Sequence, residues 1–283
     1  MYGLLTDEQR YDHVMYHLEE HLKDAQSLGY NVFAIAVQGS QNYNLDLYTN
    51  DYISDVDTRC IVIPSFEQFC REDTRISFTY VREDDSHVDM KDVASMFQLF
   101  KKQNVQFLEV LFSDFYWVNP KYKKQWDDLM TIREEVVTAF PAQLVKTLFG
   151  MSMEKYKALK HPYPTIIDKI TKYGYDGKQL HHIIRINEFL RNYISGKPFS
   201  ECLKDFSTST LKCMMDAKLN KFSLSDAEQL AKEYIDDTTA LKNSYINNTS
   251  EFVNTATYEK LEDIKVSLYK QSFKEELLSG NCS

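Results

Sequence analysis

The chain has 283 residues, 43% of them hydrophobic and 27% charged, with a formal net charge of −9 at pH 7. This length allows one large domain or two smaller ones. The acidic balance disfavours non-specific nucleic-acid binding through a broad basic surface, while leaving room for a local basic patch.

The sequence indicates neither a membrane span nor a signal peptide. No apolar run approaches 18 residues, and no basic segment is followed by an apolar leader. The five cysteines are scattered and form no Cys-x-x-Cys pair, which argues against a disulfide framework or a zinc site. We therefore expect a cytoplasmic protein without a membrane partner.

The first predicted elements are a helix and a strand. Residues 6–28 have apolar positions at helical spacing, with Thr6 as a cap and Gly29 at the end. The apolar run at 32–37 has strand composition and is followed by Gly39-Ser40. A polar loop rich in Asn and Tyr comes next.

Two carboxylates enter the next apolar run. Asp55 and Asp57 precede the strand composition of 60–63. If this segment is extended, both carboxylates share one face about 6–7 Å apart. Two carboxylates this close repel each other, and a hard divalent cation is the usual reason to tolerate them.

A second pair of extended segments is predicted at 76–81 and 87–91, joined by a charged turn at 82–86. Alternation in the second segment puts Asp89 on one face together with His87 and Lys91. After these strands, residues 91–160 are mostly helical by composition, with a loop at 117–120.

The remainder is predicted to be helical. Prolines at 162 and 164 break the chain, so we place a catalytic domain at 1–160 and a helical domain at 161–283. In the helix predicted at 175–195, three residues occupy one face at i, i+4 and i+7: Lys178, His182 and Arg185. Such cations suit a triphosphate. The alternative is a solvated basic helix face.

The combination of Gly39-Ser40 with Asp55-x-Asp57 resembles the signature of the DNA polymerase β-type nucleotidyltransferase superfamily. The resemblance implies an α+β fold whose core is a small mixed β-sheet, polymerase β palm-like, flanked by helices. It also implies that Gly39 and Ser40 hold the phosphates of a nucleoside triphosphate such as ATP. Asp55 and Asp57 would hold two Mg²⁺ ions, for which Mn²⁺ can substitute, and Asp89 is our choice for the third carboxylate.

Two further segments resemble a subfamily of predicted nucleotidyltransferases, some of them associated with RNA repair. One contains Asn104 and Leu108-Glu109, which match an N-x-x-x-L-E pattern. The other is the Lys178, His182 and Arg185 helix, where Gln179 replaces a histidine of the subfamily pattern.

The resemblance implies transfer of a nucleoside monophosphate to an acceptor hydroxyl, with release of pyrophosphate. Asp89 would take the hydroxyl proton, and Lys178 and Arg185 would offset charge on the leaving group. The favoured acceptor is an RNA 3′ end, tRNA-like RNA included. A protein hydroxyl, a small-molecule hydroxyl and an inactive nucleotide-binding or partner module of the same fold stay open.

Overall fold

The computed structural model describes residues 4–50 and 52–279, and the chain divides into two compact units. The sheet unit comprises the described residues up to Ala139 and those from Asn254 onward, and the helical unit comprises Phe140–Val253. Within the described residues, no helix has the length and apolar character needed to span a membrane.

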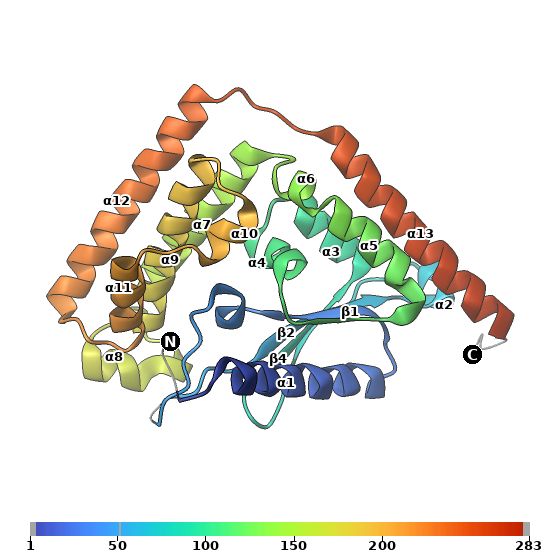
Figure 1. Ribbon diagram of the computed structural model, residues 1–283, viewed down its shortest axis with the longest axis horizontal. Coiled ribbons are helices and arrows are strands. Elements are labelled where there is room, and N and C mark those ends of the chain that lie inside the picture. Colours follow the sequence, from blue (N-terminus) through green and yellow to red (C-terminus); the bar gives the residue numbers. More distant parts are fainter. Residues whose placement is uncertain (1–3, 51, 280–283) are drawn as a thin grey trace. The chain divides into compact units, whose positions relative to one another are not determined.

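The sheet unit is built on a five-stranded mixed sheet in the order β3-β4-β2-β1-β5. Its central strands β1 and β2 are almost entirely buried, because α1 covers one face while α3 and α13 contact the sheet from the other (Figure 1). Strands β2 and β4 pair in parallel, and all other neighbours are antiparallel. The strands are β1 (Asn31–Gln38), β2 (Asp57–Ile63), β3 (Ser77–Val81), β4 (His87–Asp92) and β5 (Tyr116–Val118).

Helices and 3₁₀ turns connect these strands. Thr6, predicted to cap the first helix, does so: its hydroxyl accepts from Gln9 N at 3.2 Å, and the two residues form a capping box. The α-helices of this unit are α1 (Asp7–Ser27), α2 (Phe66–Cys70), α3 (Val93–Lys101), α4 (Val105–Leu108), α5 (Lys123–Thr131), α6 (Arg133–Val137) and α13 (Thr255–Ser279). The 3₁₀ helices are η1 (Ser40–Tyr43), η2 (Glu109–Phe112) and η3 (Pro120–Tyr122).

The helical unit is organised around its helix α9, which packs against α7, α10, α11 and α12. Ten residues of α9 are buried as a result. The elements of this unit are α7 (Pro141–Ala158), η4 (Pro164–Ile166), α8 (Ile167–Tyr173), α9 (Gly177–Ile194), α10 (Phe199–Lys204), α11 (Thr208–Lys218) and α12 (Leu224–Asn248).

The α+β class and the four strands expected around the two acidic segments are confirmed. The loop expected at 117–120 is wrong in part, because Tyr116–Val118 forms the edge strand β5 beside β1. Side-chain pattern alone does not separate a three-residue edge strand from a loop, and here pairing with a buried strand decides it.

The boundary between units differs from the expected one at residue 160. Helix α7 lies before that residue, yet its apolar face packs on α9 and α12, so it belongs to the helical unit. Helix α13 lies after it and returns to the sheet unit, where it contacts α3, α5, α6 and β2. The prolines at 162 and 164 separate α7 from α8 within one unit, so this break marks a helix end.

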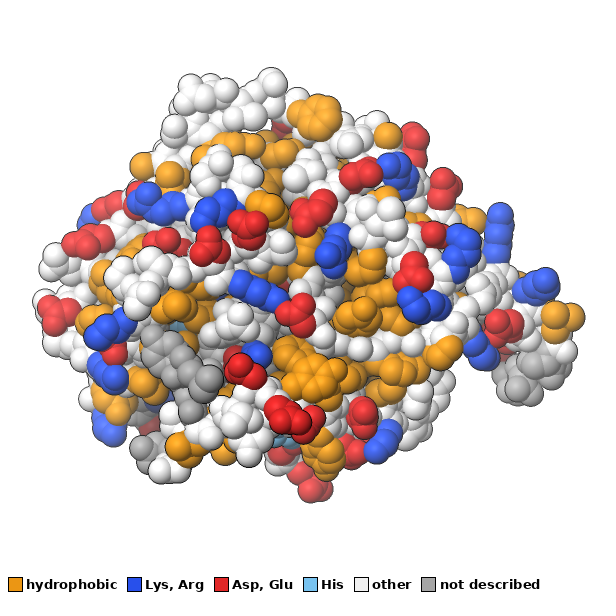
Figure 2. All heavy atoms as spheres, in the orientation of Figure 1, with side chains coloured by type: hydrophobic (Ala, Val, Ile, Leu, Met, Phe, Trp, Pro, Cys, Tyr) orange, Lys and Arg blue, Asp and Glu red, His pale blue; other side chains and the backbone are white. Residues whose placement is uncertain are grey.

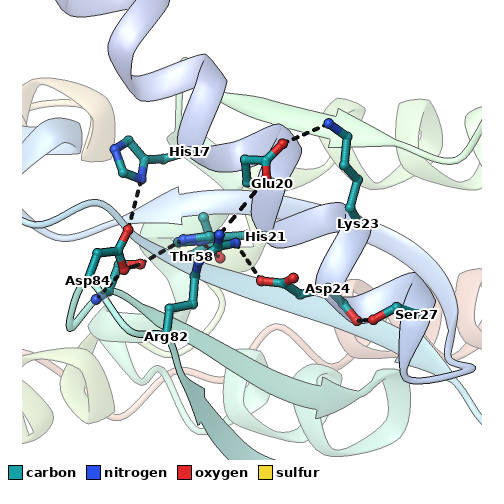
Figure 3. A network of polar contacts seen from close by, with 10 residues as sticks. His17, Glu20, His21, Lys23, Asp24, Ser27, Thr58, Arg82 and Asp84 are labelled. Atoms are coloured by element: carbon teal, nitrogen blue, oxygen red, sulfur yellow. Dashed lines mark hydrogen bonds and ion pairs between the residues drawn. The ribbon is translucent and has the colours of Figure 1, made fainter.

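A buried histidine joins α1 to the sheet (Figure 3). His21 Nδ1 lies 2.9 Å from Thr58 Oγ1 on β2, and its Nε2 lies 3.0 Å from Ser86 Oγ in the β3–β4 turn. Because Ser86 donates its own proton to Asp84 at 2.5 Å, Ser86 accepts from Nε2–H and Thr58 donates to Nδ1. Burial, with the nearby Arg82 charge, lowers the pKa of His21 to about 4. The folded state therefore requires a neutral imidazole here.

Acid is expected to destabilise the sheet unit through His21. Its pKa is near 6.5 when unfolded and about 4 when folded, so its contribution is complete above pH 6.5 and is lost as the pH falls toward 4. Over that interval, His21→Gln should lose about 3 kcal/mol less unfolding free energy than the wild type. Urea unfolding at pH 7.5, 6, 5 and 4 measures the difference, and parallel curves for the two proteins would contradict the assignment.

The start of α9 tolerates only glycine. A Cβ added at Gly177 would lie 2.1 Å from the carbonyl oxygen of Ala217 on α11. Gly177→Ala should therefore cost about 2 kcal/mol or more of unfolding free energy. The matched control is Gly150→Ala in α7, where an added Cβ meets nothing within 4 Å and should stabilise the helix by about 0.5–1 kcal/mol. Thermal unfolding of both variants measures these effects, and equal shifts would refute the packing argument.

Candidate functional site

One face of the sheet carries a row of polar side chains. Gln38 of β1 pairs with Asp57 at the start of β2, and Arg59 of β2 pairs with Asp89 of β4. Since side chains of one strand alternate between faces, Asp57 and Arg59 share a face, and their paired neighbours join them there. The structure thus places Asp57 and Asp89 on the same face of adjacent parallel strands, two positions apart along the strand direction.

An ion pair links the two strands at the centre of this face. Arg59 Nη2 lies 3.2 Å from Asp89 Oδ2, and Lys91 Nζ lies 3.5 Å from Asp89 Oδ1. Arg59 also donates from Nε to Gln38 Oε1 at 3.0 Å, and its Cζ lies 3.6 Å from the centre of the Phe107 ring. Burial lowers the pKa of Arg59 to about 10, with the Asp89 charge opposing the shift, so Arg59 is cationic at pH 7.

Asp57 has a different partner. Its Oδ1 accepts from the backbone N of His87 and lies 3.0 Å from the Nδ1 of the same residue. Asp55 lies outside β2, in the segment that leads into it, and is exposed. The backbone carbonyl of Asp55 accepts from Gln41 Nε2 at 2.7 Å, which ties this segment to η1. The alternation of side chains in β2 therefore begins at Asp57, and it does not determine on which face the Asp55 side chain lies.

The Gly39-Ser40 turn follows β1 directly, beside Asp57. Gly39 has φ 85° and ψ −142°, a backbone conformation that is essentially restricted to glycine. Its N–H donates to Glu109 Oε1 at 3.1 Å, and Glu109 is buried. The Gly39 amide is thus already hydrogen-bonded to a buried side-chain oxygen.

Two residues of the segment 104–109 contact the polar face and the turn beside it. The Asn104 side chain caps α4 by accepting from Gln106 N at 3.2 Å. Phe107 of α4 contacts Arg59, and Glu109, the first residue of η2, accepts a hydrogen bond from Gly39. The Asn104 and Glu109 positions are among those that carry the subfamily resemblance, and the structure brings Glu109 to the Gly39-Ser40 turn.

Sequence reasoning missed Arg59, Gln38 and Phe107. The period of two that relates Asp55 to Asp57 also predicts that Arg59 shares their face, because Arg59 stands two positions after Asp57. Gln38 and Phe107 had no local signal, since each is defined by contact with Arg59.

The cations predicted on α9 lie in the helical unit. Lys178 is exposed in the first turn, His182 is half-buried and Arg185 is buried among the neighbouring helices. Burial and the Arg185 charge hold the pKa of His182 well below its usual range. His182 is therefore neutral at pH 7, and Lys178 and Arg185 carry the charge on this face.

His181 has the structural role expected of it. Its Nδ1 donates to the Met214 carbonyl at 3.0 Å, and burial lowers its pKa to about 3.

Across residues 4–50 and 52–279, no three His, Cys, Asp or Glu side chains converge closely enough to hold a metal ion. The Asp89 carboxylate is instead paired with Arg59 and Lys91.

No family model and no curated protein matches this sequence. One solved structure with similarity is a nucleotidyltransferase-like protein from Exiguobacterium sibiricum 255-15, at 10% sequence identity and a TM-score of 0.28. The match covers 94% of this chain and 92% of that chain. A likeness of this size carries no argument about fold family or activity, so the site rests on the geometry above.

Removing one partner of the central ion pair should be costly. Asp89→Asn leaves Arg59, which is 5% exposed, without its main counter-ion, and should cost about 2–3 kcal/mol of unfolding free energy. Replacing both residues, in Arg59→Met/Asp89→Leu, removes the charge together with its partner and should stay within about 1 kcal/mol of wild type. Denaturant unfolding compares them, and a neutral Asp89→Asn variant would contradict this role for the pair.

Proposed function

We propose that the sheet unit carries a divalent-cation-dependent nucleotidyltransferase site on a polymerase β palm-like core. The supporting observation is the placement of Asp57 and Asp89 on one face of adjacent strands, next to the Gly39-Ser40 turn. A nucleotidyltransferase needs carboxylates for a cation beside backbone amides for phosphate, and this corner of the sheet offers both.

We propose one Mg²⁺ or Mn²⁺ ion here in place of the two expected. Asp55 and Asp57 supply carboxylate oxygens, which Mg²⁺ prefers. Asp89 is held by Arg59 and Lys91, so a second ion there would have to displace an ion pair. When bound, Mg²⁺ polarises phosphoryl oxygens and offsets their charge.

The chain's own residues take distinct roles in this proposal. The Gly39 amide and the Ser40 hydroxyl bind the terminal phosphates. The hydrogen bond from Gly39 to Glu109 breaks when they do. Asp89 accepts the proton of the attacking hydroxyl, and Arg59 fixes the position of that carboxylate. For the helical unit we retain the prediction that Lys178, His182 and Arg185 bind phosphate.

The acceptor is proposed to be a hydroxyl group, with an RNA 3′ end as first choice and protein or small-molecule hydroxyls as alternatives. The face shown in Figure 2 mixes Lys and Arg with Asp and Glu, in keeping with the net charge of −9. This favours recognition of a short acceptor end over binding along a nucleic-acid backbone.

A second candidate function is nucleotide binding without turnover. One observation favours it: the Asp89 carboxylate is engaged by Arg59, and this ion pair would have to open for catalysis.

Labelling with α-³²P nucleoside triphosphates tests the proposal. Protein is incubated with Mg²⁺ and each triphosphate, alone and with pooled small RNA, and transfer should fall roughly a thousandfold or more in Asp55→Asn/Asp57→Asn. The matched control is Asp85→Asn, because Asp85 is exposed at a turn with φ 62°, which asparagine also adopts.

Binding separates the two candidates. Mn²⁺ titration followed by water proton relaxation should show one tight ion in the wild type and in Asp85→Asn, and none in the double variant. Nucleotide binding without transfer to any acceptor would favour the binding module. Equal labelling by the wild type and the double variant would refute the assigned site.

A further inference from the structure

Strand β3 leaves one edge of the sheet open. It pairs only with β4, and all five of its residues are exposed. Native proteins usually protect such edges with charged residues, proline or a bulge. The strand sequence Ser-Phe-Thr-Tyr-Val contains no charge and no proline, and its register with β4 is continuous.

The backbone alternation shows which groups face outward. Arg82 N donates to Ser86 O at 3.0 Å and Asp92 N donates to Ile76 O at 2.9 Å, so the even-numbered positions of β3 bond to β4. In an antiparallel pair the intervening residues direct their N–H and C=O groups away from the partner strand. The outward groups therefore belong to Ser77, Thr79 and Val81.

We propose that β3 pairs antiparallel with β3 of a second copy of this chain, about a twofold axis at Thr79. In this register Thr79 opposes itself and Ser77 opposes Val81, so every outward N–H and C=O group of the strand finds a partner. Phe78 then opposes Tyr80 twice, and aromatic cross-strand pairs stabilise such sheets.

Charges beyond the strand select a second copy as the occupant. Arg75 precedes β3 and Glu83 is the first residue of the hairpin turn after it, so an antiparallel copy brings each Arg75 to the end of the strand where the other copy's Glu83 lies. Both residues are exposed, and neither forms an ion pair or a side-chain hydrogen bond within residues 4–50 and 52–279. The two ends of this edge thus carry opposite charges, which an isologous antiparallel contact brings together. An unrelated strand would need the same two charges at the same spacing.

The contact is small. A single edge of five residues buries less than the roughly 1,600 Å² of a standard interface, so the dimer should be weak and concentration-dependent.

Sedimentation equilibrium over a range of protein concentrations tests the proposal. The wild type should pass from monomer to dimer. Thr79→Pro removes an outward N–H without removing a bond to β4, and should stay monomeric, while Thr79→Val keeps the N–H and should dimerise. Thermal unfolding checks that both variants are folded.

Charge reversal at Arg75 and Glu83 tests the same dimer without a proline substitution. Glu83→Arg should weaken dimerisation roughly tenfold, because two attractive pairs become repulsive. Arg75→Glu should do the same, and Arg75→Glu/Glu83→Arg should restore the wild-type dissociation constant. A wild type that is monomeric at every concentration overturns the proposal, even if the edge captures another strand. A dimer unaffected by Thr79→Pro and by the charge reversals also overturns it, since another surface would then be responsible.

Discussion

The parallel pairing of β2 with β4 is the constraint on which the rest of the sheet unit depends. Parallel neighbours require a long crossover, and here residues 64–86 provide it through α2, β3 and the β3–β4 turn. Because β4 is occupied by β2 on one side and by β3 on the other, β3 becomes the edge. The same pairing sets Arg59 beside Asp89. The position of the candidate site and the exposed edge at β3 thus both follow from the pairing of β2 with β4.

Each face of the sheet buries one polar cluster at the β2–β4 junction. On the α1 face, His21 connects Thr58 to the β3–β4 turn as a neutral group. On the opposite face, Arg59 of β2 contacts three side chains, which are Gln38 of β1, Asp89 of β4 and Phe107 of α4. Buried polar groups are costly unless they are satisfied, so removing one partner from either cluster is expected to destabilise the sheet unit.

The proposed chemistry is in tension with this stabilisation. Arg59 neutralises the carboxylate that the superfamily resemblance assigns to a metal, and Glu109 takes the amide assigned to phosphate. Before substrate binds, Arg59 offsets the charge of Asp89, and the Glu109 side chain accepts the hydrogen bond of the Gly39 amide. In the proposed reaction, substrate binding breaks the Arg59–Asp89 ion pair and the Gly39–Glu109 hydrogen bond. The free energy needed to break them makes substrate binding less favourable.

The amino-acid sequence by itself determined the local elements. Period-two alternation located β4 and the face of Asp89, helical spacing located α1 and α9, and Thr6 marked where α1 begins. These features depend on neighbours along the chain, so local pattern contains them.

Only the tertiary structure decided the partners. The Arg59–Asp89 pair, the Glu109–Gly39 contact and the assignment of α7 and α13 to different units join residues far apart in sequence. The neutrality of His182 also depends on the helices that bury it, since an exposed imidazole at the same sequence position would keep an ordinary pKa. Burial and long-range pairing set these properties, and both arise from how the apolar faces of distant elements pack.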